Sequence, residues 1–123
     1  MTPATLAKYE VALRLATAYR DAFNAGDAAG ILSLLHPDCL FDEAEPASGK
    51  IYTRKEDIQA YLVASFKAAP GAYLSVEEAY SLGWHCVMRW CLKRDDEKDL
   101  RGVYLFTIRD GLIFSKHTYI KTD

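Results

Sequence analysis

The chain has 123 residues, of which 50% are apolar and 26% charged, and its net charge is −2. These values predict one globular domain, residues 1–123, and argue against a nucleic-acid-binding or membrane-surface protein. No apolar run approaches the roughly 20 residues of a membrane span, and the amphipathic N-terminal segment is not typical of a signal peptide. The three cysteines lack framework spacing, which indicates reduced thiols and a cytoplasmic location.

Three helices are predicted in the N-terminal part of the chain. The first carries a stripe of apolar residues at helical spacing, with Thr2 placed to cap its start and Gly26 suited to its end. Asp27 is placed to cap a short second helix, which Pro37 would end. A third helix should begin at residues 53–56, where the sequence TRKE is typical of a capping box.

Four strands are predicted in the C-terminal part, where apolar and polar residues alternate as they do in hairpins. The strands span residues 73–82, 84–93, 101–109 and 112–121. Asp110 and Gly111 form a tight-turn signal between the last two strands. Because helices come first and hairpins follow, we expect an α+β fold in which three helices pack on one face of a curved, mostly antiparallel sheet.

Alternation also predicts which residues of the first three of these strands face the helices. They are Leu74, Val76, Tyr80 and Leu82, then Cys86, Met88, Trp90 and Leu92, then Gly102, Tyr104, Phe106 and Ile108. The phase of the last strand is open, because either Lys116 and Thr118 or His117 and Tyr119 could face inward. The outer face would carry His85, Val87, Arg89 and Cys91. Since that face is only partly polar, we expect it to form a homodimer interface.

A further strand, predicted at residues 39–43, carries the most informative carboxylate. If Phe41 lies in the core, alternation turns Glu43 the same way, into apolar surroundings. An inward carboxylate is costly unless it is satisfied or used, and burial would raise its pKa and strengthen it as a general base. The alternative is a carboxylate tied to an arginine or to backbone N–H groups. In the opposite phase, Asp42 would take its place.

Several stretches carry a family resemblance. They are residues 19–27 (YRDAFNAGD), 35–38 (LHPD), 101–106 (RGVYLF) and 110–113 (DGLI). With this order of elements, the chain resembles the nuclear transport factor 2-like superfamily, and most closely its SnoaL-like polyketide cyclases and bacterial ketosteroid isomerases. The resemblance implies a cone-shaped α+β barrel. It says less about activity, because this fold hosts enzymes, binding proteins and docking modules.

The resemblance also implies catalytic residues. Glu43 matches the position of the isomerases' carboxylate base, and Tyr19 matches their tyrosine donor to the substrate oxygen. Tyr104 stands where they have a protonated aspartate, and a phenol can also donate a hydrogen bond. The isomerases have a further tyrosine at the position that Leu62 occupies in this chain, and Tyr61 is the residue next to it. The side chains expected to bind substrate are Phe41, Tyr61, Met88, Trp90, Phe106, Lys116 and Thr118.

The leading hypothesis is a cofactor-free enzyme that performs acid/base chemistry on an apolar carbonyl compound, as an isomerase, cyclase or lyase. Glu43 would remove a proton next to the carbonyl, and Tyr19, with Tyr104, would stabilise the oxyanion. No metal is expected, because the histidines lie far apart in the sequence and the cysteines form no paired motif. The alternatives are a non-catalytic module that binds an apolar ligand, and a dimerisation domain that uses the outer sheet face.

Overall fold

The computed structural model describes residues 3–44, 49–95 and 97–122, so the cap expected at Thr2 lies outside the described residues. The helices are α1 (Pro3–Asn24), α2 (Ala28–Leu32) and α3 (Lys55–Ala68). The strands are β1 (Leu35–Glu43), β2 (Lys50–Tyr52), β3 (Tyr73–Leu82), β4 (His85–Lys93), β5 (Leu100–Arg109) and β6 (Leu112–Ile120). Helices therefore precede the hairpins, which confirms the predicted α+β order.

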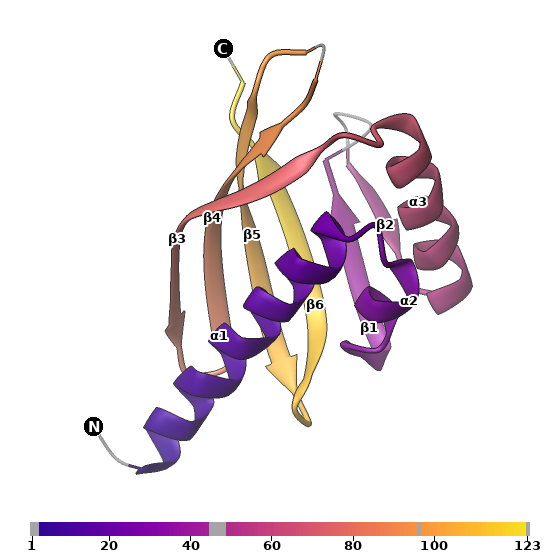
Figure 1. The fold of residues 1–123 in the computed structure, drawn as a ribbon. Coiled ribbons are helices and arrows are strands. Elements are labelled where there is room, and N and C mark those ends of the chain that lie inside the picture. Colours follow the sequence, from indigo (N-terminus) through magenta and orange to yellow (C-terminus); the bar gives the residue numbers. More distant parts are fainter. Residues whose placement is uncertain (1–2, 45–48, 96, 123) are drawn as a thin grey trace.

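The strands form one sheet in the order β2-β1-β6-β5-β4-β3. All neighbouring strands are antiparallel except β1 and β6, which run parallel. Figure 1 shows α1 lying across the sheet, with α2 and α3 together beside β1 and β2. Helix α1 contacts β3 and β4, whereas α3 contacts β1 and β2. The helices thus cover one face of the sheet, and side chains on that face form the core.

Strand β1 has the predicted phase, because Cys39, Phe41 and Glu43 are buried while the residues between them are only half-buried. The prediction that Pro37 ends the second helix is wrong, since α2 ends at Leu32 and Pro37 lies within β1. The pairing of β1 with β6 is irregular just there. A proline fits such an interruption because it has no N–H to donate to the ladder.

A β-bulge at Glu77 changes the face that the end of β3 presents. Val76 pairs with Trp90, but Glu78 already pairs with Arg89, so one residue is inserted. Beyond the bulge every side chain changes sides. The prediction that Tyr80 and Leu82 face inward is therefore wrong, and both are exposed.

A second bulge settles the phase of β6. Thr107 pairs with Ser115 and Ile108 with Ile113, which leaves Phe114 as the inserted residue. Ile113 faces the core before the bulge, and Lys116 does so after it. Of the two open alternatives, the one with Lys116 and Thr118 facing inward is therefore correct, and His117 and Tyr119 lie on the outer side. The turn before β6 has positive φ at Asp110 (55°) and Gly111 (74°), as its sequence predicts.

The start of α3 differs from the predicted capping box. Arg54 is the N-cap residue and makes no side-chain cap hydrogen bond. Glu56 and Asp57 lie in the first turn, where their negative charge is favourable to the helix dipole. On the inner side of α3, Ile58 and Leu62 are buried.

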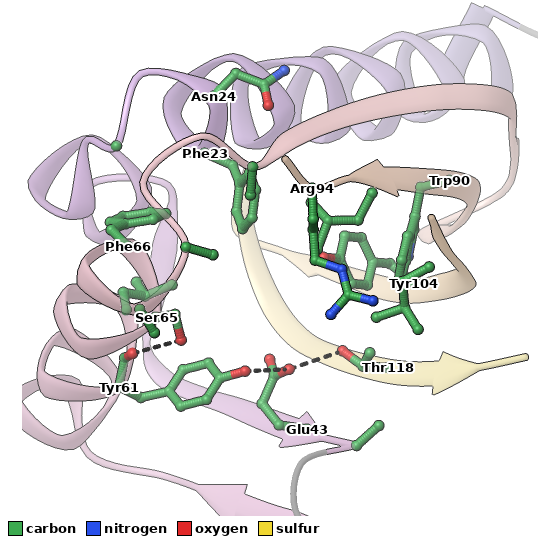
Figure 2. Close-up of a pocket in the computed structure, with 18 of the residues that line it drawn as sticks. Phe23, Asn24, Glu43, Tyr61, Ser65, Phe66, Trp90, Arg94, Tyr104 and Thr118 are labelled. Atoms are coloured by element: carbon green, nitrogen blue, oxygen red, sulfur yellow. Dashed lines mark hydrogen bonds between the residues drawn. The ribbon is translucent and has the colours of Figure 1, made fainter. Parts of the chain in front are cut away.

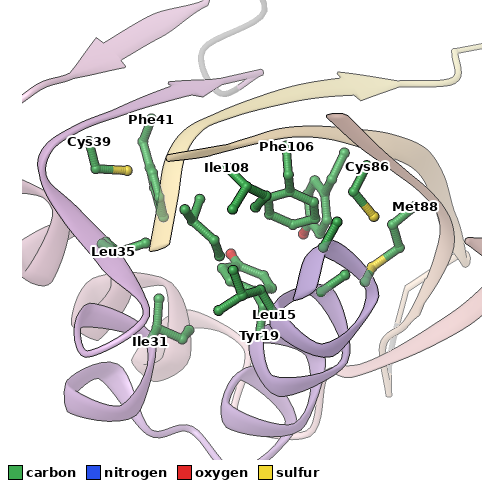
Figure 3. Close-up of a cluster of buried hydrophobic side chains, with 14 of the residues drawn as sticks. Leu15, Tyr19, Ile31, Leu35, Cys39, Phe41, Cys86, Met88, Phe106 and Ile108 are labelled. Atoms are coloured by element: carbon green, nitrogen blue, oxygen red, sulfur yellow. The ribbon is translucent and has the colours of Figure 1, made fainter. Parts of the chain in front are cut away.

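The hydrophobic core lies between α1, α2 and the inner face of the sheet (Figure 3). Its largest members include Tyr19 from α1, Phe41 from β1 and Phe106 from β5, each no more than 1% exposed. The rings of Tyr19 and Phe106 lie 5.6 Å apart. This packing closes one end of the space between the helices and the sheet and leaves the other end hollow.

Candidate active site

A cavity of about 500 Å³ opens beyond the core, between the C-terminal ends of α1 and α3 and the β4–β5 hairpin. Its volume is within the range of small-molecule sites. Figure 2 shows side chains from both helices and from β1, β4, β5 and β6 directed into it. Seven of the residues predicted for the site line it, namely Tyr19, Glu43, Tyr61, Trp90, Tyr104, Lys116 and Thr118.

Glu43 lies at the polar end of this cavity and is only 5% exposed. Its Oε1 is paired with the ammonium of Lys116. Its Oε2 accepts hydrogen bonds from the hydroxyls of Tyr61 (3.1 Å) and Thr118 (3.3 Å). The carboxylate is thus buried but fully paired, and its cation is a lysine where the sequence suggested an arginine.

Lys116 is itself buried, with 2% exposure, and sits among aromatic rings. Its Nζ lies 4.4 Å from the ring centroid of Tyr104, 4.7 Å from that of Phe41 and 5.4 Å from that of Tyr19. Burial is the largest single effect on the pKa of Lys116 and acts to lower it, but the charge of Glu43, its hydrogen bond and the nearby phenols Tyr104 and Tyr61 together outweigh burial, so the net pKa is raised. The ammonium therefore stays protonated and is stabilised by both the carboxylate and the rings.

Tyr19 and Tyr104 are buried phenols whose hydroxyls form no hydrogen bond with another described residue. Burial, and next the charge of Glu43, raise the pKa of Tyr19 well above 10. Burial also raises the pKa of Tyr104, although the charge of Lys116 opposes it. Both phenols are therefore protonated, and both can donate to a ligand oxygen in the cavity.

Tyr61 reaches the cavity from α3. Its ring packs at a tilt against that of Tyr52 in β2, with the ring centroids 5.0 Å apart, and Ser65 donates to the carbonyl oxygen of Tyr61 at 2.8 Å. Burial first, and then the charge of Glu43, raise its pKa. Tyr61, the neighbour of the family's tyrosine position at Leu62, thus supplies the phenol that contacts the carboxylate of Glu43.

Three of the expected wall residues, Phe41, Met88 and Phe106, do not line the cavity. They are buried in the core behind it (Figure 3). Asp42 lies on the other side of β1, where its Oδ2 is 3.0 Å from Nδ1 of His117. The structure therefore separates two acid–base pairs by the thickness of the sheet, with Glu43 and Lys116 on the cavity side.

Four residues that line the cavity were not assigned to the site from the sequence, namely Phe23, Phe66, Leu92 and Arg94. Phe23, Phe66 and Leu92 form much of the apolar wall, and Arg94 lies at the mouth. Arg94 continues the inward phase of β4 two residues beyond Leu92, so alternation could have found it. The charged composition of residues 94–99, however, is typical of a solvated hairpin loop.

Within the described residues, no cluster of histidine, cysteine, aspartate and glutamate has the arrangement of a metal site. Among the described helices, none combines the length and hydrophobicity needed to cross a membrane. The polar groups at the closed end of the cavity include a carboxylate, an ammonium and phenols.

Solved structures share this architecture. A nuclear transport factor 2-like protein of unknown function from Mesorhizobium loti superposes with a TM-score of 0.82 at 23% identity, covering 94% of each chain. A Kribbella flavida protein provisionally named a ketosteroid isomerase gives 0.80 at 21% identity, covering 94% of this chain and 82% of its own. A Sinorhizobium meliloti protein provisionally named a polyketide cyclase superposes with a TM-score of 0.76 at 21% identity, covering 86% of this chain and 94% of its own.

These likenesses define the fold class, the nuclear transport factor 2-like or cystatin-like α+β proteins. The sequence itself matches the model of the SnoaL-like domain over residues 16–116, so the chain belongs to the SnoaL-like domain family. No curated protein matches the sequence. Because the solved structures are under 25% identical to this chain, they establish its fold and leave its activity to be argued from the cavity.

Proposed function

We propose that the chain is a small-molecule enzyme whose cavity performs acid/base chemistry of the isomerase, cyclase or lyase type on an apolar carbonyl compound. The observation that carries the proposal is the meeting of a buried carboxylate, Glu43, with two buried phenols, Tyr19 and Tyr104, on the wall of one cavity. Neither phenol hydroxyl is bonded to a described residue. Their donors are thus available to a substrate oxygen.

In the proposed reaction Glu43 accepts a proton from the carbon next to the carbonyl. Three donors face its carboxylate, an arrangement that suits the deprotonated form a base needs. As the proton leaves, negative charge develops on the carbonyl oxygen, and the hydroxyls of Tyr19 and Tyr104 stabilise it. The ammonium of Lys116 adds a positive charge beside both groups. These steps use only side chains of the chain.

The experiment is exchange of α-protons for deuterium in a panel of aryl and alkyl ketones, followed by NMR. We expect Glu43→Gln to slow exchange by on the order of 10²-fold or more. Asp42→Asn is the matched control, because it changes the neighbouring carboxylate on the far side of the strand. If the parent is active and Glu43→Gln keeps all of that activity, Glu43 is not the base.

A catalytically silent binding module is the second candidate, and the pairing of Glu43 with Lys116 favours it, since a fully paired carboxylate also suits a purely structural role. This candidate predicts saturable binding of apolar ketones to the parent without exchange. It also predicts that Glu43→Gln alters affinity little.

We further propose a homodimer through the outer sheet face, in a cytoplasmic protein. Tyr80, Val87 and Leu105 lie side by side there, because Val87 pairs with both neighbours. Tyr80 and Leu105 are exposed, so the row leaves apolar surface uncovered. Val87→Glu should halve the mass in solution, and a monomer in both forms would contradict the dimer. The three cysteines are free and buried, which supports a reducing compartment.

A further inference from the structure

Arg94 lines the cavity, and the proposed reaction does not use its chemistry. It follows β4, continues the inward row of Trp90 and Leu92, and its side chain is directed into the cavity in Figure 2. The side chain is 23% exposed. An arginine in this position presents a fixed fork of donors to anything that enters.

The hairpin holds Arg94 over the cavity. Its Nη1 is 2.8 Å from Oε2 of Glu97, and its Nη2 donates to the carbonyl oxygen of Lys98 at 2.7 Å. On the other side of the hairpin, Asp95 packs against Gly71 so closely that a Cβ at Gly71 would lie 2.7 Å from its Cγ. The hairpin thus contacts the loop after α3.

Two N–H donors on this wall lack an acceptor. Both Nε of Arg94 and Nε1 of Trp90 are buried and have no hydrogen-bond partner among the described residues. A buried donor without an acceptor is costly, and native structures keep few of them. Two such donors four residues apart on one wall indicate that this end of the cavity is built to meet hydrogen-bond acceptors.

The ion pair that Arg94 forms with Glu97 is weak. Its partner Glu97 is 65% exposed, and exposed ion pairs contribute little because solvent screens them. A carboxylate brought in by a ligand can therefore displace Glu97 from the guanidinium at small cost. Such a carboxylate could take the place of Glu97 at Nη1, and Nε, which has no partner among the described residues, is a second donor on the same guanidinium.

We propose that the substrate is an apolar carbonyl compound that carries a carboxylate, a keto acid whose carboxylate binds Arg94 while its carbonyl lies near Tyr19 and Glu43. This inference rests on the proposed function, because it assigns the two ends of the substrate to the two polar ends of the same cavity. The apolar wall between them, which includes Phe23, Phe66 and Leu92, covers the hydrocarbon part.

The test uses matched probes, benzoylpropionate, benzoylbutyrate and benzoylvalerate, each beside its neutral carboxamide. Binding to the full chain is measured by isothermal titration calorimetry. At least one acid should bind the parent on the order of tenfold more tightly than its amide. Arg94→Gln should remove this difference without weakening the amide, and Arg94→Lys should keep part of it. Glu97→Gln, which removes the competing carboxylate, should tighten the acid.

Arg54→Gln is the control, since Arg54 forms a similar exposed pair with Glu56 at 2.9 Å and does not line the cavity. It should leave the preference for the acid intact. Equal affinities for acid and amide, a preference that survives Arg94→Gln, or no binding of any of the acids would each overturn the inference.

Exchange of the α-protons of the same probes separates this inference from the proposed function. If the Arg94-dependent preference is present but no probe exchanges, the substrate class stands and the catalytic proposal fails. If acids and amides exchange with equal KM values and the exchange depends on Glu43, the catalytic proposal stands and the substrate class fails.

Discussion

Lys116 and Glu43, 73 residues apart in the sequence, form an ion pair in which both side chains are almost completely buried. Strand β1 supplies the carboxylate and β6 the ammonium, and the two strands are the parallel pair of the sheet. The pair is stabilised by hydroxyl groups from Thr118 and Tyr61 and by the aromatic rings around the ammonium. It therefore joins β1 to β6 and places a paired charge at the polar end of the cavity.

Lys116→Met should destabilise the protein by about 3–5 kcal/mol, because it leaves the carboxylate of Glu43 buried without its cation. Replacing both residues, as Glu43→Leu with Lys116→Met, should cost less than the single change, since no charge is then left unpaired. Urea unfolding followed by circular dichroism measures both values. A double variant that is as unstable as the sum of the two single variants would contradict this coupling.

Stability should fall as pH rises above about 10. The pKa of Lys116 in the folded chain is raised above the ordinary 10.5, so its contribution is complete below 10.5 and is lost as pH rises through the folded value. Tyr19 and Tyr104 act in the same direction, because their raised pKa values keep them protonated when the unfolded chain ionises near 10. Lys116→Met should flatten the decline, which unfolding at several alkaline pH values would reveal. An equal slope in that variant would argue against the assignment.

Tyr19→Phe should separate activity from stability. The hydroxyl bonds no described residue, so its loss should change the free energy of unfolding by less than about 1 kcal/mol. If Tyr19 stabilises the oxyanion, α-proton exchange should slow on the order of 10²-fold. Unfolding and exchange measured on the same preparation test both parts. A variant that unfolds normally and exchanges at the parent rate would remove Tyr19 from the mechanism.

Tyr61→Phe should behave differently, because this hydroxyl donates to Glu43 at 3.1 Å. We expect a loss of about 1.5–3 kcal/mol, the range for a hydrogen bond to a charged group. Tyr52→Phe is the control, since its ring packs against Tyr61 and it makes no hydrogen bond to Glu43. Equal effects of the two substitutions would mean that the contact with Glu43 contributes nothing.

Gly102→Ala should disturb the wall of the cavity. A Cβ there would lie 2.5 Å from Cζ2 of Trp90 and would also meet the carbonyl oxygen of Tyr119. We expect a destabilisation of about 1–3 kcal/mol, typical of overpacking. Trp90→Leu should be less harmful in the Gly102→Ala background than alone, because it removes part of the clash. Additive effects of the two changes on unfolding would show that the Trp90 ring is not what the methyl group meets.

Much of the fold follows from local patterns in the sequence. Alternation predicts the inward phase of β1, and with it the burial of Glu43, because side chains of a strand point to opposite faces in turn. The turn at Asp110 and Gly111 is equally local, since both residues tolerate positive φ. Such features depend on a few neighbouring residues, and so they can be inferred without knowing what those residues pack against.

Only the tertiary structure decided which residues contact the carboxylate of Glu43. The inserted residues at Glu77 and Phe114 exchange the two faces of β3 and β6, and neither bulge has a local signal in the sequence. The second bulge turns Lys116 inward, and the parallel pairing of β1 with β6 then places its ammonium at the carboxylate. The sequence by itself thus determined a buried acid on a SnoaL-like fold. Its conversion into a paired acid at the end of a cavity depends on contacts between distant segments, whose register is set by the packing of the whole sheet.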